Sequence, residues 1–212
     1  MISIGSYDEL NELVGMNRSE DYEDYFGVMD LSDSEKENRI ELAERLEDNF
    51  LLVLAFLFTV QQYQSVNWEM ARERFESAYR DALSDAIIID EYLDSYIRRF
   101  SYDVTESTQN YVNDPYYYSF DRSRLMSENE SNTVWNYSNF QTAIQNGYTR
   151  KQWIDIRDRK ERETHRAVGR TIKPINEPFV VGNSLMMFPK DSETFGASSS
   201  EIVNCRCSIR YV

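Results

Sequence analysis

The sequence predicts an α+β fold, with a mostly α-helical N-terminal body and a small C-terminal α+β unit of one helix and short antiparallel strands. Three observations lead to this prediction. No glycine occurs between Gly27 and Gly147, and the first proline is Pro115, so a long stretch lacks both helix breakers. That stretch is rich in Glu, Leu, Ala and Arg, which favour helices. The other three prolines and three of the seven glycines follow residue 168, where helical spacing gives way to short strand-like segments.

Capping signals place the first two helices. Ser34-Glu35-Lys36-Glu37 is a capping-box pattern, and it predicts a helix that runs to about Tyr63. Asn67 is expected to cap a second helix, in which apolar residues from Ala71 to Ala82 recur at three- and four-residue spacing.

Two further helices complete the predicted body. Apolar residues from Tyr92 to Phe100 predict a third helix, and Asn113-Asp114-Pro115 ends this pattern. A fourth helix is expected from about Asp121 to Asn146, with Gly147 at its C-terminal end.

The C-terminal unit is expected to begin with a helix over Arg150 to Ala167. In such a helix Asp158, Arg162 and His165 have i, i+4, i+7 spacing and share one face. Beyond it, Gly182-Asn183 is a plausible two-residue hairpin turn. The predicted strands are Thr171 to Lys173, Phe179 to Val181, Leu185 to Phe188 and Ile202 to Ile209.

Charge is divided unevenly along the chain. The net charge of −14 makes general nucleic-acid affinity of the whole molecule improbable. Residues 1–149 contain 29 acidic and 11 basic side chains, whereas residues 150–212 contain 8 acidic and 12 basic ones. We therefore predict two regions that face different partners, an acidic helical region at 1–119 and an α+β region at 120–212.

The most apolar stretch is Phe50 to Val60, with ten apolar residues in eleven. It is too short to span a bilayer, which needs about 20 residues, so no membrane partner is expected. The favoured interpretation is a buried helix segment, and the alternative is a docking surface for a larger assembly. The first residues, Met1 to Gly5, do not resemble a secretion signal. We therefore expect a reducing cytoplasm and no disulfide.

The rare reactive side chains gather near the C-terminus. The only histidine, His165, and the only cysteines, Cys205 and Cys207, fall within the last 48 residues. Zinc favours thiolate and imidazole ligands in tetrahedral geometry, so these three are candidate metal ligands, with Asp158 as a candidate fourth. The alternative is a buried thiol pair beside a histidine that hydrogen-bonds to Asp158 or to a backbone carbonyl. We favour the second interpretation and expect no cofactor, with zinc as the alternative.

Catalysis is the minority interpretation of the same residues. A cysteine with a histidine can form a nucleophile pair. However, the chain contains no G-x-S-x-G elbow, no P-loop and no H-E-x-x-H helix. The arginines between residues 157 and 166 could contact DNA phosphates, but acidic residues interleave with them and favour a solvated, salt-bridged surface. We therefore expect no enzymatic activity.

The order of the C-terminal residues resembles a known family, the F-like minor head proteins of Mu-type tailed phages, also called head morphogenesis proteins. The resemblance covers about residues 120–210. The segments that carry it are, in chain order, Arg124-Leu125-Met126-Ser127-Glu128, Gly147-x5-Trp153, Asp158-x3-Arg162-x2-His165, Pro178-Phe179, Met187-Phe188-Pro189 and Glu201-x2-Asn204-Cys205-Arg206-Cys207. The chain departs from the family pattern at Ser127, where the family has threonine. It also departs at Val168-Gly169-Arg170, a loop that is therefore expected to differ in shape.

The resemblance implies a virion component that is present in few copies. Such a protein is made in the host cytoplasm and lies in the capsid interior at the portal vertex, where members are linked to head assembly and DNA delivery. The residues to which the family motif carries over are Glu128, Trp153, Asp158, Arg162, His165, Cys205, Arg206 and Cys207.

We expect these motif residues to form a polar clamp. Glu128 and Asp158 are expected to pair with Arg162 or Arg206, because buried charges need partners. His165 is expected to lie near the thiols. The clamp would fix the long helix, the helix with Trp153 and the last strand together.

The leading hypothesis is therefore a structural minor capsid protein of a tailed phage. Its expected partners are the portal protein or other head proteins, and its basic C-terminal region offers a contact for phage DNA. One alternative is a small phage-encoded effector enzyme, a nuclease-type toxin that uses His165. Another is a zinc-stabilised adaptor.

Overall fold

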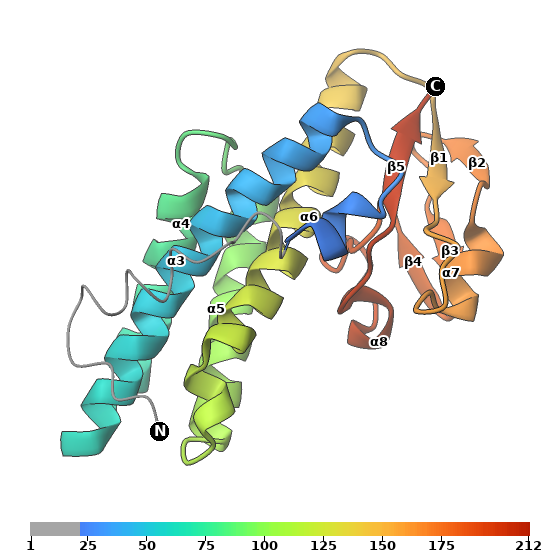
Figure 1. The fold of residues 1–212 in the computed structure, drawn as a ribbon. Helices are drawn as coiled ribbons and strands as arrows, with labels where there is room; N and C mark the ends of the chain where they lie inside the picture. The colour runs from blue at the N-terminus through green and yellow to red at the C-terminus, as the bar shows by residue number, and fades with distance from the viewer. Residues whose placement is uncertain (1–21) are drawn as a thin grey trace.

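A computed structural model describes residues 22–212, and they form an α+β fold as the sequence predicts. Figure 1 shows long helices packed side by side, with the strands gathered to one side of them. Residues 1–21 lie outside the described residues. The start of the predicted 1–119 region and the expectation about Met1 to Gly5 therefore fall outside them too.

Four long helices form the body, close to the four that the sequence predicts. A short π-helical turn, η1 (Glu23–Gly27), precedes them, and a 3-10 turn, η2 (Pro115–Tyr118), occupies the predicted break before the last one. The four helices are α3 (Asp33–Tyr63), α4 (Trp68–Leu83), α5 (Glu91–Asn110) and α6 (Phe120–Gln145).

The helix ends confirm most of the capping predictions. The Asn67 side chain accepts a hydrogen bond from the amide of Met70, and Gly147 follows α6 with a φ of 76°. The prediction that Ser34 begins α3 is wrong. Ser32 caps the helix, because its side chain accepts from the amide of Glu35 while the Glu35 carboxylate accepts from the amide of Ser32. Ser34 also precedes a glutamate by three residues, but it already lies inside the first turn.

One apolar core joins the four helices. Phe50 of α3 packs edge-on against Tyr79 of α4 and is stacked on Phe100 of α5. The apolar run from Phe50 to Val60 supplies five of the buried side chains of α3, so the predicted buried segment is confirmed for one helix face, whereas Leu52 and Phe58 are exposed. Among residues 22–212, no helix has the length and apolar character that a membrane span requires.

The same core crosses the predicted boundary between residues 119 and 120. Val134, Tyr137 and Phe140 of α6 are buried together with the side chains of α3, α4 and α5, and Phe188 from the C-terminal unit joins them. The division into regions 1–119 and 120–212 stays a prediction. The shared core shows that α6, which begins the second region, packs with the helices of the first.

The predicted helix over Arg150 to Ala167 is wrong. Residues Arg150–Ile154 form strand β1, and only Glu163–Val168 form a helix, α7. β1 pairs antiparallel with the last strand on one side and with β2 on the other, and this pairing buries Trp153. Arg157 then adopts a φ of 60°, which an α-helix does not allow. Asp158, Arg162 and His165 therefore do not share a helical face.

The remaining strands form two small antiparallel sheets. Their bounds are β2 (Ile172–Pro174), β3 (Phe179–Val181), β4 (Ser184–Met186) and β5 (Ser208–Tyr211). The three-stranded sheet has the order β2-β1-β5, and β3 and β4 form a separate hairpin. The predicted turn at Gly182-Asn183 is confirmed, and Gly182 has the positive φ, 59°, that the first position of a II′ turn requires.

The predicted strand from Ile202 to Ile209 is only partly confirmed. Its first residue ends a short helix, α8 (Ser199–Ile202), and the strand itself begins at Ser208. Asn204 has a φ of 57°, so the backbone turns there between helix and strand. The predicted strand at Leu185 to Phe188 is likewise displaced, because Phe188 packs against the helices instead.

Candidate functional site

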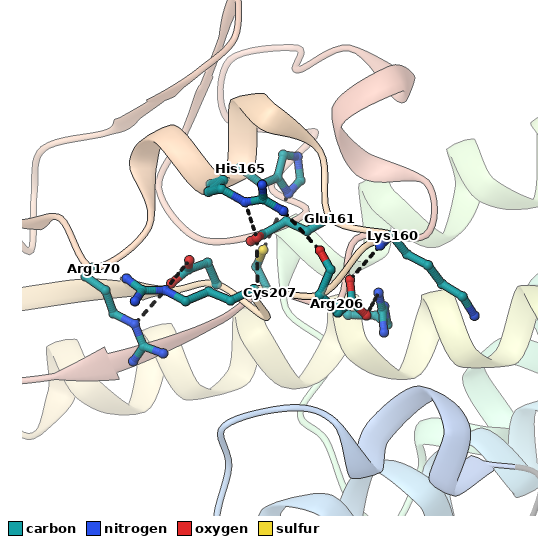
Figure 2. Close-up of polar contacts among 10 residues, drawn as sticks. Lys160, Glu161, His165, Arg170, Arg206 and Cys207 are labelled. Carbon is teal, nitrogen blue, oxygen red and sulfur yellow. Dashed lines mark hydrogen bonds and ion pairs between the residues drawn. The ribbon is translucent and has the colours of Figure 1, made fainter.

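His165, Cys205 and Cys207 meet in the interior of the C-terminal unit. The His165 Nδ1 atom lies 3.5 Å from the Cys205 sulfur and 3.4 Å from the Cys207 sulfur. One donor atom from each residue lies within 4.8 Å of the others. All three side chains are buried, each residue being 2 % exposed, and both cysteines are free thiols. Figure 2 shows His165 above Cys207, with their contact drawn as a dashed line.

Three local features bring these side chains together. The short helix α7 presents His165, whereas the turn at Asn204 directs the chain so that both cysteines precede β5. The amide of Cys205 donates to the carbonyl of Ile202, which holds this turn closed. The indole of Trp153, on β1, packs edge-on against the His165 ring with a centroid distance of 5.9 Å.

A carboxylate fixes the far side of the imidazole. The His165 Nε2 atom lies 3.1 Å from Glu201 Oε2, and the hydroxyl of Thr164 donates to the same oxygen at 2.8 Å. A carboxylate at Nε2 favours a proton on that nitrogen. The lone pair of Nδ1 then faces the two sulfurs.

Electrostatics favour a thiolate at Cys205. Burial raises the pKa of this thiol, but hydrogen bonds with Cys207 and His165 and the nearby ammonium of Lys190 outweigh burial and hold the pKa well below its usual range. The Cys207 thiol has a raised pKa, because its hydrogen bond with Cys205 and its burial act in the same direction. Burial lowers the pKa of His165, yet the hydrogen bond and negative charge of Cys205 give a net rise.

An asparagine ladder on α6 holds the Asn204-Cys205-Arg206-Cys207 segment. The Asn132 Nδ2 atom donates to the carbonyl of Cys205 at 2.9 Å, and Asn136 Nδ2 donates to the carbonyl of Cys207 at 3.2 Å. One turn earlier, Asn129 Nδ2 donates to Asn204 Oδ1 at 2.9 Å. The ladder therefore positions the backbone of both cysteines.

Two buried cations complete the ladder. The guanidinium of Arg39, from α3, donates to Asn132 Oδ1 at 3.3 Å and to Asn136 Oδ1 at 3.2 Å, and burial lowers its pKa to about 10. The ammonium of Lys190 donates to Asn129 Oδ1 at 2.7 Å, and burial lowers its pKa to about 8. Each asparagine oxygen thus has a donor, as buried polar groups require.

The predicted polar clamp is present around one ion pair. Asp158 accepts a 2.6 Å hydrogen bond from Arg206, which joins the loop after β1 to the segment before β5. Arg162 instead donates to the carbonyl of Val203. Glu128 forms an i,i+4 pair with Arg124 at 3.3 Å. The contacts of Asp158 and Arg162 therefore join the segment after β1 to the segment before β5, whereas the Glu128–Arg124 pair stays within α6, so the predicted three-way clamp is confirmed only in part.

Two of the predicted roles of Asp158 are wrong. It does not belong to the group of donor atoms around His165, so it is not the fourth metal ligand of this arrangement. Nor does it hydrogen-bond to His165, because Glu201 takes that position. The cause lies in the loop: with no helix over residues 155–162, the Asp158 side chain turns toward Arg206 instead.

The arginine-rich segment is largely salt-bridged, as predicted. Arg157 pairs with the buried carboxylate of Asp155 at 3.0 Å, and Arg166 pairs with Glu161 at 3.2 Å. Arg170 also reaches Asp155 at 3.0 Å. Figure 2 shows the dashed contacts of Glu161 and Arg170 beside His165 and Cys207. Arg159 and Lys160 remain exposed.

An open hollow of about 470 Å³ lies beside the cluster. Its walls combine acidic, basic and apolar side chains. They are Asp24, Tyr25, Leu125, Glu128, Lys160, Arg162, Asn204 and Arg206. Neither the sulfurs nor the imidazole line it, so the hollow gives no access to the reactive atoms.

The sequence interpretation missed the groups that support the cluster. Glu201 lies 36 residues from His165, and nothing in the sequence pairs them. Asn129, Asn132 and Asn136 did carry a signal, because they share one helical face in a helix with apolar neighbours. A buried amide face of this kind indicates a hydrogen-bonded partner segment.

Comparison with protein-family models, with curated proteins and with solved structures gave no match to this chain. The resemblance to F-like minor head proteins therefore stays a prediction. Its support consists of the motif residues and of the positions that these residues take in the fold.

Proposed function

We propose that this chain is a structural minor head protein of a tailed phage, associated with the portal vertex and with head assembly or DNA delivery. The observation that supports it most strongly is the location of the motif residues in the fold. Trp153, His165, Cys205 and Cys207 form one buried cluster, and Asp158 and Arg206 pair beside it. Motif residues that bind one another inside the protein are those of a structural module.

Burial of the reactive atoms favours this role over an effector enzyme. A catalytic His165 or Cys205 needs substrate at its ring or sulfur. Both residues are 2 % exposed, and the adjacent hollow is lined by neither. An enzyme would have to open the packing of Trp153 and the asparagine ladder before each turnover.

Charge suggests how the two parts of the molecule meet their partners. The acidic helical body is suited to the portal protein or another head protein with a basic surface. The C-terminal unit has the opposite net charge, and Arg150, Arg159 and Lys160 are exposed on it. These three side chains are the proposed contact for phage DNA.

The test is the composition of particles from the phage that encodes the chain. Mass spectrometry of purified virions and procapsids should find the protein in few copies, and a map of the intact particle should place it at the portal vertex. Absence from both particles would overturn the proposal. A His165→Ala variant should enter particles less well, whereas Tyr63→Ala, which changes an 86 % exposed side chain, should enter normally.

A further inference from the structure

The distances around His165 match the edges of a zinc coordination tetrahedron. With a zinc–sulfur bond of about 2.3 Å and a zinc–nitrogen bond of about 2.0 Å, sulfur and nitrogen ligands lie about 3.5 Å apart. The two sulfur–Nδ1 distances are 3.4 and 3.5 Å. Two of the three edges between these donor atoms thus have the length that one tetrahedral ion requires, and all three atoms lie within 4.8 Å of one another.

Hydrogen bonds and a metal ion would use the same three donor atoms. Because Glu201 lies at Nε2, that nitrogen carries the proton, and Nδ1 has a single lone pair. Two sulfurs face that lone pair, so it can accept fully from only one thiol. A cation bound between the three atoms would satisfy both sulfurs and the nitrogen at once.

The neighbouring residues hold the ligands as metal sites require. A metal-bound histidine usually donates its other ring N–H to a carboxylate, and Glu201 takes this place for His165. The asparagine ladder fixes the backbone of the two cysteines. These contacts are independent of the sulfur–nitrogen distances, and they leave the ligand atoms directed inward.

We propose that His165 Nδ1, Cys205 Sγ and Cys207 Sγ bind one zinc ion that stabilises the C-terminal unit. The ligand set is soft and tetrahedral, which selects zinc over magnesium or calcium. The two thiols release their protons to solvent as the zinc–sulfur bonds form. The ion is structural because its ligands are buried and do not line the adjacent hollow.

Glu161 lies outside this group of three donor atoms, and it is the carboxylate we assign to the open fourth position. Its side chain is 2 % exposed, and its Oε1 atom is buried without a hydrogen-bond partner in the described part of the chain. Its charge is close enough to Cys207 to raise the pKa of that thiol, and Figure 2 shows the two side chains next to each other. Its other oxygen, Oε2, accepts from the amide of Arg157 and from Arg166 Nε, so Oε1 is the oxygen that is free to bind the ion.

The size of the local core explains why this unit gains from a metal. Apart from the two cysteines, its buried apolar cluster contains only Trp153, Val168, Phe179, Val181 and Met186. A structural zinc site contributes its binding free energy to folding. Zinc would therefore join α7 and the segment before β5 where apolar burial is limited.

The experiment measures zinc in the full-length chain. Protein purified without chelators and reconstituted with zinc should hold one equivalent by elemental analysis. Cobalt in its place should give the intense visible bands of a tetrahedral thiolate site. Cys207→Ser should lose both signals. Val168→Ala, in the same apolar cluster, should lower stability yet keep the metal.

Two results would overturn the proposal. One is folded wild-type protein that holds less than about half an equivalent of zinc after reconstitution. The other is a Cys207→Ser variant that binds cobalt with an unchanged spectrum. If Cys207→Ser fails to fold, the cobalt spectrum of the wild-type chain decides alone. The result is separate from the head-protein role, which the particle composition tests.

Discussion

Asn132 of α6 donates a 2.9 Å hydrogen bond to the backbone carbonyl of Cys205. The same amide accepts from the buried guanidinium of Arg39 on α3. One side chain thus connects the first long helix, α6 and the cysteine segment. The position of the cluster depends on the helical body as well as on the C-terminal unit.

We expect Asn132→Ala to lower the free energy of unfolding by about 3 kcal/mol. The change leaves the Cys205 carbonyl and one donor of the Arg39 guanidinium buried without their partner. Urea unfolding of the purified chain measures the loss. Asn139→Ala is the matched control, because Asn139 is on the same helix and only part-buried, and it should cost less than about 0.5 kcal/mol. Equal losses for the two variants would show that the ladder is not important for stability.

Glu201→Gln should weaken zinc binding by about 10- to 100-fold while the three ligands remain. The neutral amide polarises the His165 ring less than the carboxylate does, and it can present its NH₂ group to Nε2. Competition with a coloured chelator gives the affinity. Glu193→Gln, which changes a carboxylate that pairs with Arg99 of α5 and not with His165, is the control and should leave the affinity unchanged. An equal affinity for wild type and Glu201→Gln would contradict the assigned role of Glu201.

Glu161→Gln tests the fourth ligand. An amide oxygen binds zinc more weakly than a carboxylate, so we expect the affinity to fall by at least about tenfold. The cobalt spectrum should shift as well, since the ligand field changes. The same variant weakens the ion pair with Arg166, so Arg166→Gln is the control. If Arg166→Gln reproduces the full loss, Glu161 acts through the ion pair and is not a ligand.

The helices were predictable from the sequence because local signals decide them. Asn67 and Gly147 mark ends that short-range hydrogen bonds and a positive φ enforce. Strand β1 was not predictable in the same way. Residues Arg150–Ile154 become a strand through pairing with β5, which lies about sixty residues later in the chain. Tertiary pairing of this kind overrides a helical spacing of polar residues.

The candidate site was predictable only in its chemistry. A single histidine and two cysteines near one end of the chain indicated where reactive groups could meet, and they do meet. The roles of their supporting partners were not visible, because Glu201 lies in the single-turn helix α8 and Lys190 in a turn, and neither belongs to a periodic pattern. Asp158 shows the reverse case, a residue of suitable type that the loop conformation directs elsewhere.

The position of the α3 cap gives a prediction about two neighbouring serines. Ser32→Ala should lower the free energy of unfolding by about 1 kcal/mol, because it removes the acceptor for the Glu35 amide. Ser34→Ala should change it by less than about 0.5 kcal/mol, since Ser34 lies within the helix. Thermal or urea unfolding compares them. A larger loss of stability for Ser34→Ala than for Ser32→Ala would show that Ser34, and not Ser32, caps α3.

Lys151 gives a prediction about pH. Its side chain is buried, with the ammonium donating to the carbonyl of Met187 at 2.7 Å and lying over the rings of Phe140 and Phe179. Burial lowers the pKa of Lys151 from 10.5 to about 8. Between these two values the unfolded chain holds a proton on Lys151 that the folded chain has released. The contribution of Lys151 to the free energy of unfolding therefore rises with pH between about pH 8 and pH 10.5.

The comparison that isolates this effect is wild type against Lys151→Met. Methionine has a similar length and no charge, so the variant lacks the proton release of Lys151 but keeps the titrations of Lys190 and the tyrosines. From pH 8 to pH 10 the stability of wild type relative to the variant should rise by about 2 kcal/mol. Urea unfolding at four or five pH values measures the difference. A difference that stays constant, or falls, over this range would mean that the folded protein keeps Lys151 charged, with its ammonium in contact with water.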